Sequence, residues 1–276
     1  ITYNSAENGG NGANQAVETK YGSAVSLPSA TKNNWNFLGW NGNANATSGI
    51  NSYTMPQANV TLFAIFSKEL SLNFQDIGGV TKTLKVVIYN KATSGKVTLP
   101  ALGEPTAPWE KDGWSNSPTP DANRINRVFT AQDITLDSSN SGQTWYACYK
   151  NILTATYNTV ANGGSGNVAQ TNVTAYYNGG RISKPTMTLS RDIASKNAWD
   201  FVGWNMNENE KVGVTEIASV TVDFTVYAIY KRDLTVKMFS QNLSVPQTAL
   251  TYTLWNKEVS HDFTLQTPQA TEGSGW

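Results

Sequence analysis

A Gly-Trp pair occurs four times in this chain, and its recurrence limits the folds open to the chain more than any other feature. Three of the four pairs have a second tryptophan five residues before the tryptophan of the pair. The pairs are Gly39-Trp40, Gly113-Trp114, Gly203-Trp204 and Gly275-Trp276, and the earlier tryptophans are Trp35, Trp109 and Trp199. A single catalytic domain has no physical reason to repeat the signature of its core, whereas tandem folding units do. The sequence therefore predicts a series of small repeated units.

The repeated units are of two alternating kinds. Each complete unit closes with an aromatic run that ends in Lys68, Lys150 or Lys231. The first and third units share Thr-Tyr-Asn and Asn-Gly-Gly sequences, and their Gly-Trp pairs lie 164 residues apart. The second and fourth units share an aromatic-Asn-Lys sequence. The predicted order is A-B-A′-B′, with repeat A at residues 1–68, repeat B at 69–150, repeat A′ at 151–231 and a truncated repeat B′ at 232–276.

The two ends of the chain lead to further expectations. Repeat B′ stops at its Gly-Trp pair without a closing strand, and repeat A lacks the apolar run that precedes its counterpart, so we expect both ends to be cuts through a longer series. Three states are open for residues 232–276. In the first, the rest of the unit is absent or disordered. In the second, a strand from the next molecule completes the unit, as in donor-strand filaments. In the third, the unit stands alone in a rearranged form.

Composition narrows the classes of function. Units of this size bury only about 60 % of their unfolded surface, so each needs a dense core. Nine Trp, twelve Tyr and nine Phe supply it. Charged residues make up only 14 % and the net charge is zero, which argues against nucleic acid as a partner and against electrostatic attraction to membranes. No apolar run reaches the roughly 20 residues of a membrane span, and no signal peptide is expected at Ile1.

The local sequence predicts β-structure almost throughout. Runs such as residues 84–89 and 220–227 are rich in β-branched and aromatic residues, and Gly-rich turns separate such runs. Pro28, Pro100 and Pro185 are each expected to end a short extended run at corresponding places. No helical period of ten residues occurs, although an insertion near residues 192–198 could form a turn. Connections of one or two residues between units predict that neighbours are held stiffly.

The order of motifs within a unit resembles the Listeria–Bacteroides repeat, the B-repeat type of the internalins. The motifs are a β-strand, Asn-Gly-Gly, Leu or Lys before Pro, Phe-x-Gly-Trp and a final aromatic-Ala-x-aromatic-Lys. The resemblance covers repeats A and A′ well. Repeat B replaces the Phe by Lys111 and loses the Asn-Gly-Gly, and repeat B′ is truncated. The resemblance implies a mostly β chain of tandem small β-grasp-like repeat domains in an elongated array, on a bacterial cell-surface or secreted protein.

The tryptophans have two alternative roles. Trp faces bind sugars and cations, so they could form a ligand-stacking surface. Recurrence beside Gly is more typical of a core aromatic packed on a close backbone. We therefore predict a structural core made of Trp40, Trp114, Trp204, Trp276, Trp35, Trp109 and Trp199 with Gly39, Gly113 and Gly203.

Other motifs carry little chemistry. The Gly-rich segments at residues 9–12 and 163–166 lack the helix and Lys of a phosphate loop and are predicted to be hairpin turns. The Asn-x-Asn-x-Asn sequences at residues 41–45 and 205–209 have the spacing of calcium loops but few carboxylates, so we expect solvated turns. His261 is the only histidine, and Cys148, the only cysteine, is expected to be a buried, inert side chain.

These observations predict a non-enzymatic structural or adhesive segment of a bacterial surface or secreted protein, with no catalytic residue, cofactor or metal. The expected partners are neighbouring repeats or copies of the chain itself. The alternative is a ligand-binding adhesion module that recognises a glycan or a host protein.

Overall fold

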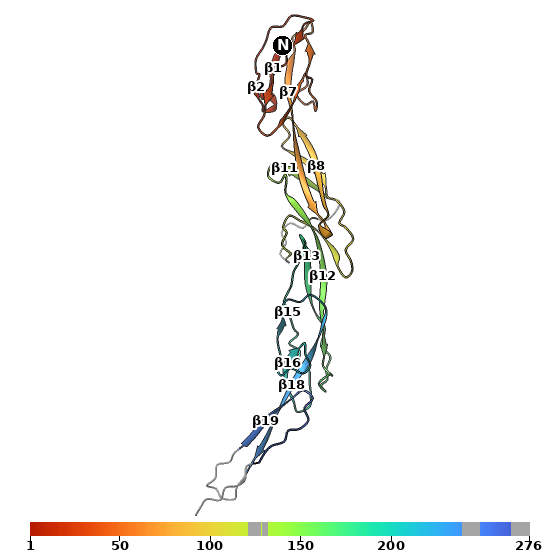
Figure 1. Cartoon of the computed structure of the whole chain (residues 1–276). Helices are drawn as coiled ribbons and strands as arrows, with labels where there is room; N and C mark the ends of the chain where they lie inside the picture. The colour runs from red at the N-terminus through yellow and green to blue at the C-terminus, as the bar shows by residue number, and fades with distance from the viewer. Residues whose placement is uncertain (121–127, 129–131, 239–248, 266–276) are drawn as a thin grey trace, which may run out of the picture. The chain divides into compact units, whose positions relative to one another are not determined.

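The computed structural model describes the whole chain except residues 121–127, 129–131, 239–248 and 266–276 (Figure 1). The chain divides into two compact units, one formed by Ile1–Lys150 with Tyr176–Ser183 and the other by Asn151–Ala175 with Lys184–Trp276. The prediction of a mostly β chain is confirmed. The described residues form strands and two short 3-10 helices, η1 (Ala6–Asn8) and η2 (Ile77–Gly79), and no α-helix.

Repeat A is arranged around the long strand β7 (Thr61–Gln75). Its opening strand β1 (Thr2–Asn4) runs parallel to β7, with Tyr3 opposite Leu62. The Gly-Trp strand β5 (Asn36–Asn41) runs antiparallel to β7, with a bulge between Phe37 and Gly39. Four short strands complete the repeat as two ribbons, β2 (Asn11–Gly12) with β4 (Ala30–Thr31), and β3 (Ala24–Val25) with β6 (Tyr53–Thr54).

Repeat B has the same strand frame, which we define as an opening strand parallel to the long closing strand and a Gly-Trp strand antiparallel to it. The second half of β7 is its opening strand, and it runs parallel to the start of β12 (Thr144–Asn158). The Gly-Trp strand β10 (Glu110–Ser115) is antiparallel to β12 and bulges between Lys111 and Trp114. The remaining strands are β8 (Thr81–Tyr89), antiparallel to β7, and the ribbon of β9 (Ser94–Thr98) with β11 (Asp133–Asp137).

Repeat A′ reproduces the frame a third time. The end of β12 runs parallel to β18 (Phe224–Lys237), and β16 (Asp200–Asn205) runs antiparallel to β18 with the same bulge. The other strands of repeat A′ are β13 (Thr171–Asn178) and β14 (Arg181–Ile182), and β15 (Met187–Thr188) with β17 (Glu216–Ile217). In repeat B′, β19 (Ala249–Trp255) is antiparallel to β18.

The strands join a large mixed sheet instead of forming clearly separate tandem domains, which corrects the expectation of discrete units. The reason is that β7 closes repeat A and opens repeat B without a break. Lys68-Glu69, one of the short connections expected to hold neighbouring units stiffly, lies inside that strand. The implied β-grasp likeness has no counterpart in the described residues, because none of them forms an α-helix for the sheet to pack against. The four repeat boundaries remain a prediction.

Candidate functional site

The tryptophans of the first three Gly-Trp pairs lie in the cores. Trp40, Trp114 and Trp204 are at most 2 % exposed. In each repeat a ring from the opening strand meets the indole edge-on, with ring centroids 5.0 Å apart for Tyr3–Trp40, 5.1 Å for Phe74–Trp114 and 4.7 Å for Tyr157–Trp204. A tryptophan buried to this degree has no free face for a glycan. The fourth pair, with Gly275 and Trp276, lies outside the described residues.

In repeats A and B the buried indole N–H donates to the carbonyl of a proline. The distance from Trp40 Nε1 to the Pro28 oxygen is 2.7 Å, and that from Trp114 Nε1 to the Pro100 oxygen is 3.0 Å. A buried donor without a partner costs about 1–3 kcal/mol. The Leu-Pro sequence therefore serves to satisfy the tryptophan, a role that the sequence did not reveal.

The expectation that Pro185 corresponds to Pro28 is wrong. Pro28 follows its short strand, β3, whereas Pro185 precedes the equivalent strand, β15, and its carbonyl accepts from the N–H of Val220. The residue that occupies the place of Pro28 is Ser190. Repeat A′ has two more residues than repeat A between this position and the buried alanine that follows, Ala194 in repeat A′ and Ala30 in repeat A. The insertion is the reason that the sequence matched Pro28 with the wrong residue.

In the three described Gly-Trp pairs, the backbone conformation requires the glycine. Gly39, Gly113 and Gly203 have φ values of 116°, 89° and 145°, a region that L side chains rarely adopt. A Cβ on Gly39 would also lie 2.6 Å from the carbonyl oxygen of Ile50. These glycines produce the bulge that turns the following tryptophan into the core.

The tryptophans that precede the Gly-Trp pairs, Trp35, Trp109 and Trp199, are only half-buried. A lysine side chain lies over the ring of two of them. The Nζ atom of Lys32 lies 3.7 Å above the ring of Trp35, and Lys196 lies 3.7 Å above the ring of Trp199. Burial is the first cause that lowers the pKa of both lysines. Trp109 instead meets the ring of Tyr177 edge-on, at 6.3 Å between centroids.

Repeat A is joined to repeat B by the side-chain amide of Asn90, at the end of β8. Its Oδ1 accepts from the backbone N–H of Phe66 at 3.0 Å, and its Nδ2 donates to the carbonyls of Ala44 at 3.0 Å and Ala46 at 2.8 Å. Asn90 is buried and has a φ of 54°, which asparagine tolerates better than most residues. Lys32 also donates to the backbone carbonyl of Asn90. One amide thus makes three bonds to the preceding repeat.

Two further asparagines, Asn178 and Asn256, also donate to carbonyls of a preceding loop, and we call this contact the asparagine joint. Asn256 follows β19 and makes the same three bonds, from Tyr230 N and to the carbonyls of Glu208 and Glu210. Asn178, in the segment of β13 that belongs to the first unit, makes only the two donor bonds, to the carbonyls of Ser117 and Thr119, and its Oδ1 has no partner among the described residues. In every case the acceptors lie in the loop after a Gly-Trp strand. The recurring Asn-Lys pair was the sequence signal for the joints at Asn90 and Asn256, whereas Asn178 is followed by Gly179.

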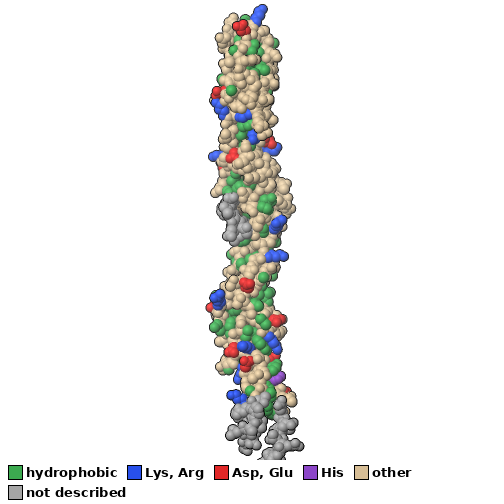
Figure 2. All heavy atoms as spheres, turned by 90° about the vertical axis from the view of Figure 1, so that its left-hand side faces the viewer, with side chains coloured by type: hydrophobic (Ala, Val, Ile, Leu, Met, Phe, Trp, Pro, Cys, Tyr) green, Lys and Arg blue, Asp and Glu red, His purple; other side chains and the backbone are tan. Residues whose placement is uncertain are grey.

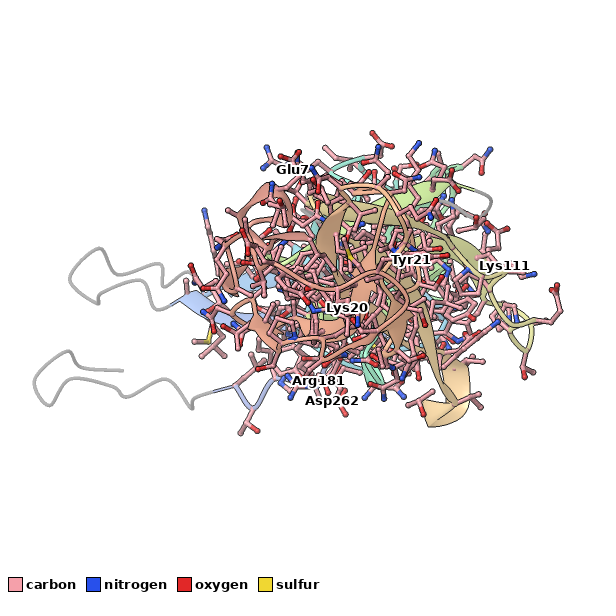
Figure 3. The ribbon with its side chains drawn as sticks, turned by 90° about the horizontal axis from the view of Figure 1, so that it is seen from above. Glu7, Lys20, Tyr21, Lys111, Arg181 and Asp262 are labelled. Atoms are coloured by element: carbon pink, nitrogen blue, oxygen red, sulfur yellow. The ribbon has the colours of Figure 1, made fainter. Side chains whose placement is uncertain are left out.

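A surface ion pair accompanies two of the joints. Lys91, next to Asn90, pairs with the carboxylate of Glu7, which is labelled in Figure 3. Lys257, next to Asn256, pairs with Glu208 at 3.0 Å. Both pairs are exposed, so their contribution is small.

The Asn-Gly-Gly sequences have a structural role within repeats A and A′. The Nδ2 atom of Asn8 donates to the carbonyls of Ala44 and Ala64, and Asn162 makes the corresponding bonds in repeat A′. A Cβ on Gly10 would lie 2.5 Å from the ring of Phe66. The expected hairpin turn is a 3-10 turn, η1, that packs against the closing strand.

In repeat B the corresponding place is occupied by a buried tyrosine, Tyr149, that is hydrogen-bonded to the half-buried Asp76. The Tyr149 hydroxyl donates to Asp76 Oδ1 at 2.6 Å, and Asp76 also accepts from the N–H groups of Ile77 and Gly103. Burial, followed by the hydrogen bond to Asp76, raises the pKa of Tyr149 well above its usual range.

The remaining candidates do not converge on a reaction centre. The Oδ1 atoms of Asn41 and Asn43 accept backbone N–H groups two residues on, so they close turns and do not point at a common cation. No group of three His, Cys, Asp or Glu within the described ranges is arranged to hold a metal. His261 stacks on Tyr252, and Cys148 is buried with its Sγ donating to a carbonyl.

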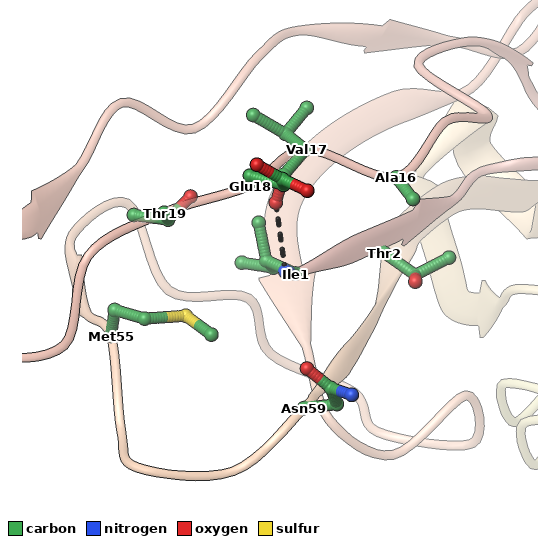
Figure 4. A pocket seen from close by; sticks show the side chains of 8 residues that line it. All are labelled: Ile1, Thr2, Ala16, Val17, Glu18, Thr19, Met55 and Asn59. Carbon is green, nitrogen blue, oxygen red and sulfur yellow. Dashed lines mark hydrogen bonds between the residues drawn. The ribbon is translucent and has the colours of Figure 1, made fainter.

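A pocket of about 520 Å³ lies beside the opening strand of repeat A (Figure 4). It is lined by Ile1, Val17, Glu18 and Met55, and the Ile1 amine donates across it to the Val17 carbonyl at 3.0 Å. The pocket contains one carboxylate and no second titratable side chain, so it has no arrangement for acid–base catalysis.

The surface is polar with scattered charge. On the face in Figure 2, basic and acidic side chains are interspersed among uncharged ones, and neither sign gathers in a patch. Within the described part of the chain, no helix has the length and apolar character needed to cross a membrane.

These features define a class of small β-repeats whose repeated residues serve packing and joining. The family model of the Listeria-Bacteroides repeat domain matches residues 1–65 and 154–229, and the chain belongs to this family. The family is found in bacterial surface proteins and is typically non-catalytic. Comparison with curated proteins and with solved structures gave no significant match.

Proposed function

We propose that this chain is a non-catalytic spacer of a bacterial cell-surface or secreted protein, which holds whatever it carries at a fixed distance. The observation that carries the proposal is the asparagine joint, supported by the shared strand β7. A linker that allows free rotation would need flexible residues between repeats, whereas here an uninterrupted strand and the three hydrogen bonds of one buried asparagine side chain connect repeats A and B.

The charge pattern is consistent with a spacer. A segment that bound nucleic acid or an anionic surface would need a basic face. This chain has 20 basic and 20 acidic residues. Its recurring residues are buried at the same places in successive repeats, as expected where selection acts on packing.

Small-angle scattering of the full chain tests the proposal. A compact chain of this length has a radius of gyration of about 19 Å. A spacer built as a linear series of repeats should give a much larger value, with a scattering profile typical of a rod. A value close to 19 Å would refute the spacer.

A matched pair of variants identifies the cause of any stiffness. Asn90→Ala combined with Asn178→Ala and Asn256→Ala removes all three joints, and the scattering profile should become that of a flexible chain. Asn36→Ala removes an exposed amide on β5 and should leave the profile unchanged. Association of copies, including completion of residues 232–276 by a second chain, stays a prediction, which sedimentation at high concentration would test.

A further inference from the structure

Repeat A′ contains a pocket of about 540 Å³ beside its buried tryptophan. Its lining includes Leu189, Ser190, Arg191, Val202 and Trp204. This volume falls in the range typical of small-molecule sites. All of the lining residues belong to the second unit.

A two-residue insertion distinguishes this part of repeat A′ from repeat A. In repeat A, one residue separates Pro28 from the buried Ala30. In repeat A′, three residues separate Ser190 from the equivalent Ala194, which is also buried. The extra length displaces the backbone that would supply the acceptor for the indole.

The consequence is an unsatisfied donor. The Nε1 atom of Trp204 is buried and has no hydrogen-bond partner among the described residues, whereas Trp40 and Trp114 each have a proline carbonyl. In repeat A the indole N–H points to the position that Ser190 occupies in repeat A′, and Ser190 lines the pocket. The pocket is therefore on the side where Trp204 lacks its acceptor.

The lining also indicates the chemistry of an occupant. Arg191 brings a guanidinium, which pairs well with a carboxylate. Leu189, Val202 and Val214 give an apolar wall, and Ile193 at the rim is 75 % exposed, so an aliphatic body would cover it. Glu216 also lines the pocket and disfavours an occupant with more than one negative charge.

We propose that this pocket binds a small monocarboxylate with a branched aliphatic body. Its carboxylate accepts from Arg191 and from the indole N–H of Trp204, and its aliphatic part lies on the apolar wall. This ligand-binding role is additional to the spacer function and does not depend on it.

The three homologous indoles allow a test with internal controls. We would titrate the full ¹⁵N-labelled chain with 4-methylpentanoate and follow the indole N–H resonances. The Trp204 resonance should shift and saturate, while those of Trp40 and Trp114 stay in place. The amine with the same carbon skeleton should have no effect, because it offers no anionic acceptor. The tripeptide Gly-Gly-Leu, with its free terminal carboxylate, distinguishes a peptide terminus from a free acid as the natural source.

Two variants complete the test. Replacing Ser190 by Pro and deleting Arg191 and Asp192 restores the sequence pattern of repeat A, so it should close the pocket and abolish the shift. Arg191→Ala keeps the loop length and should weaken binding by about tenfold, the loss expected for one charge-assisted hydrogen bond. The proposal is overturned if 4-methylpentanoate leaves the Trp204 resonance in place, moves all three indoles alike, or binds Arg191→Ala as tightly as the unmodified chain.

Discussion

Repeats A and B use the same strand frame but differ in the contact made by one aromatic residue of the closing strand, Phe66 in repeat A and Tyr149 in repeat B. We call the place of this contact the corner. Both place an aromatic ring edge-on to the Gly-Trp tryptophan and satisfy its indole with a proline carbonyl. The corner differs. Repeat A packs the apolar ring of Phe66 on Gly10, whereas repeat B pairs the Tyr149 hydroxyl with the Asp76 carboxylate.

This difference coincides with what the family model detects. The model matches residues 1–65 and not repeat B, although the parallel and antiparallel pairings and the bulge are the same in both. The fold of a repeat thus depends on a few contacts around the tryptophan. The packing of Phe66 against the Asn-Gly-Gly turn is therefore one of at least two side-chain arrangements that are compatible with the same strand frame.

If the tryptophan contacts define the frame, Trp40→Ala and Trp114→Ala should be equally damaging. Each should cost about 3–5 kcal/mol, as is typical for a large core aromatic. Urea unfolding followed by near-ultraviolet dichroism measures this loss. A cost below about 1 kcal/mol in either repeat would show that its tryptophan is not part of the core.

The apolar corner should be sensitive to a single methyl group. Gly10→Ala places a Cβ 2.5 Å from the Phe66 ring, so the ring must move. We expect a loss of about 1–3 kcal/mol, the usual cost of overpacking. Gly42→Ala is the matched control, since a Cβ there meets open space. Equal stability of the two variants in the same urea titration would contradict the packing described for this corner.

The polar corner should respond to pH instead. Because the pKa of Tyr149 is raised in the folded chain, folding retains its proton. Its contribution is complete below the unfolded pKa of about 10 and is lost as the pH rises above it. Tyr149→Phe should cost about 1–2 kcal/mol at pH 7 by removing a donor from Asp76.

The same variant should also flatten the decline of stability above pH 10. Urea midpoints at pH 8, 10 and 11 test this. Phe66 has no hydroxyl to titrate, so Phe66→Leu should leave the pH slope unchanged. A slope that Tyr149→Phe does not alter would mean that other tyrosines, such as Tyr230, carry the effect.

The sequence predicted the β class and the family because the Gly-Trp mark depends on local chemistry: a glycine with positive φ followed by a large aromatic. It failed where geometry depends on distant residues. Pro185 was matched with Pro28 because the sequence showed an insertion near residues 192–198 but not where it begins, which is clear only when β15 and β17 are seen to pair. The asparagine joint was missed since Asn90 and its acceptor at Ala44 lie far apart in sequence. The Asp76–Tyr149 pair spans 73 residues and leaves no motif.

The central claim is that a shared strand and the asparagine joint make repeats A and B one cooperative unit. Native-state hydrogen exchange of the full chain tests it most directly, by comparing amides of β5 in repeat A with amides of β8 in repeat B. We predict a common opening free energy in the unmodified chain and in Asn36→Ala, and a lower value for β5 than for β8 in Asn90→Ala. Different opening free energies in the unmodified chain, unaffected by Asn90→Ala, would contradict the account.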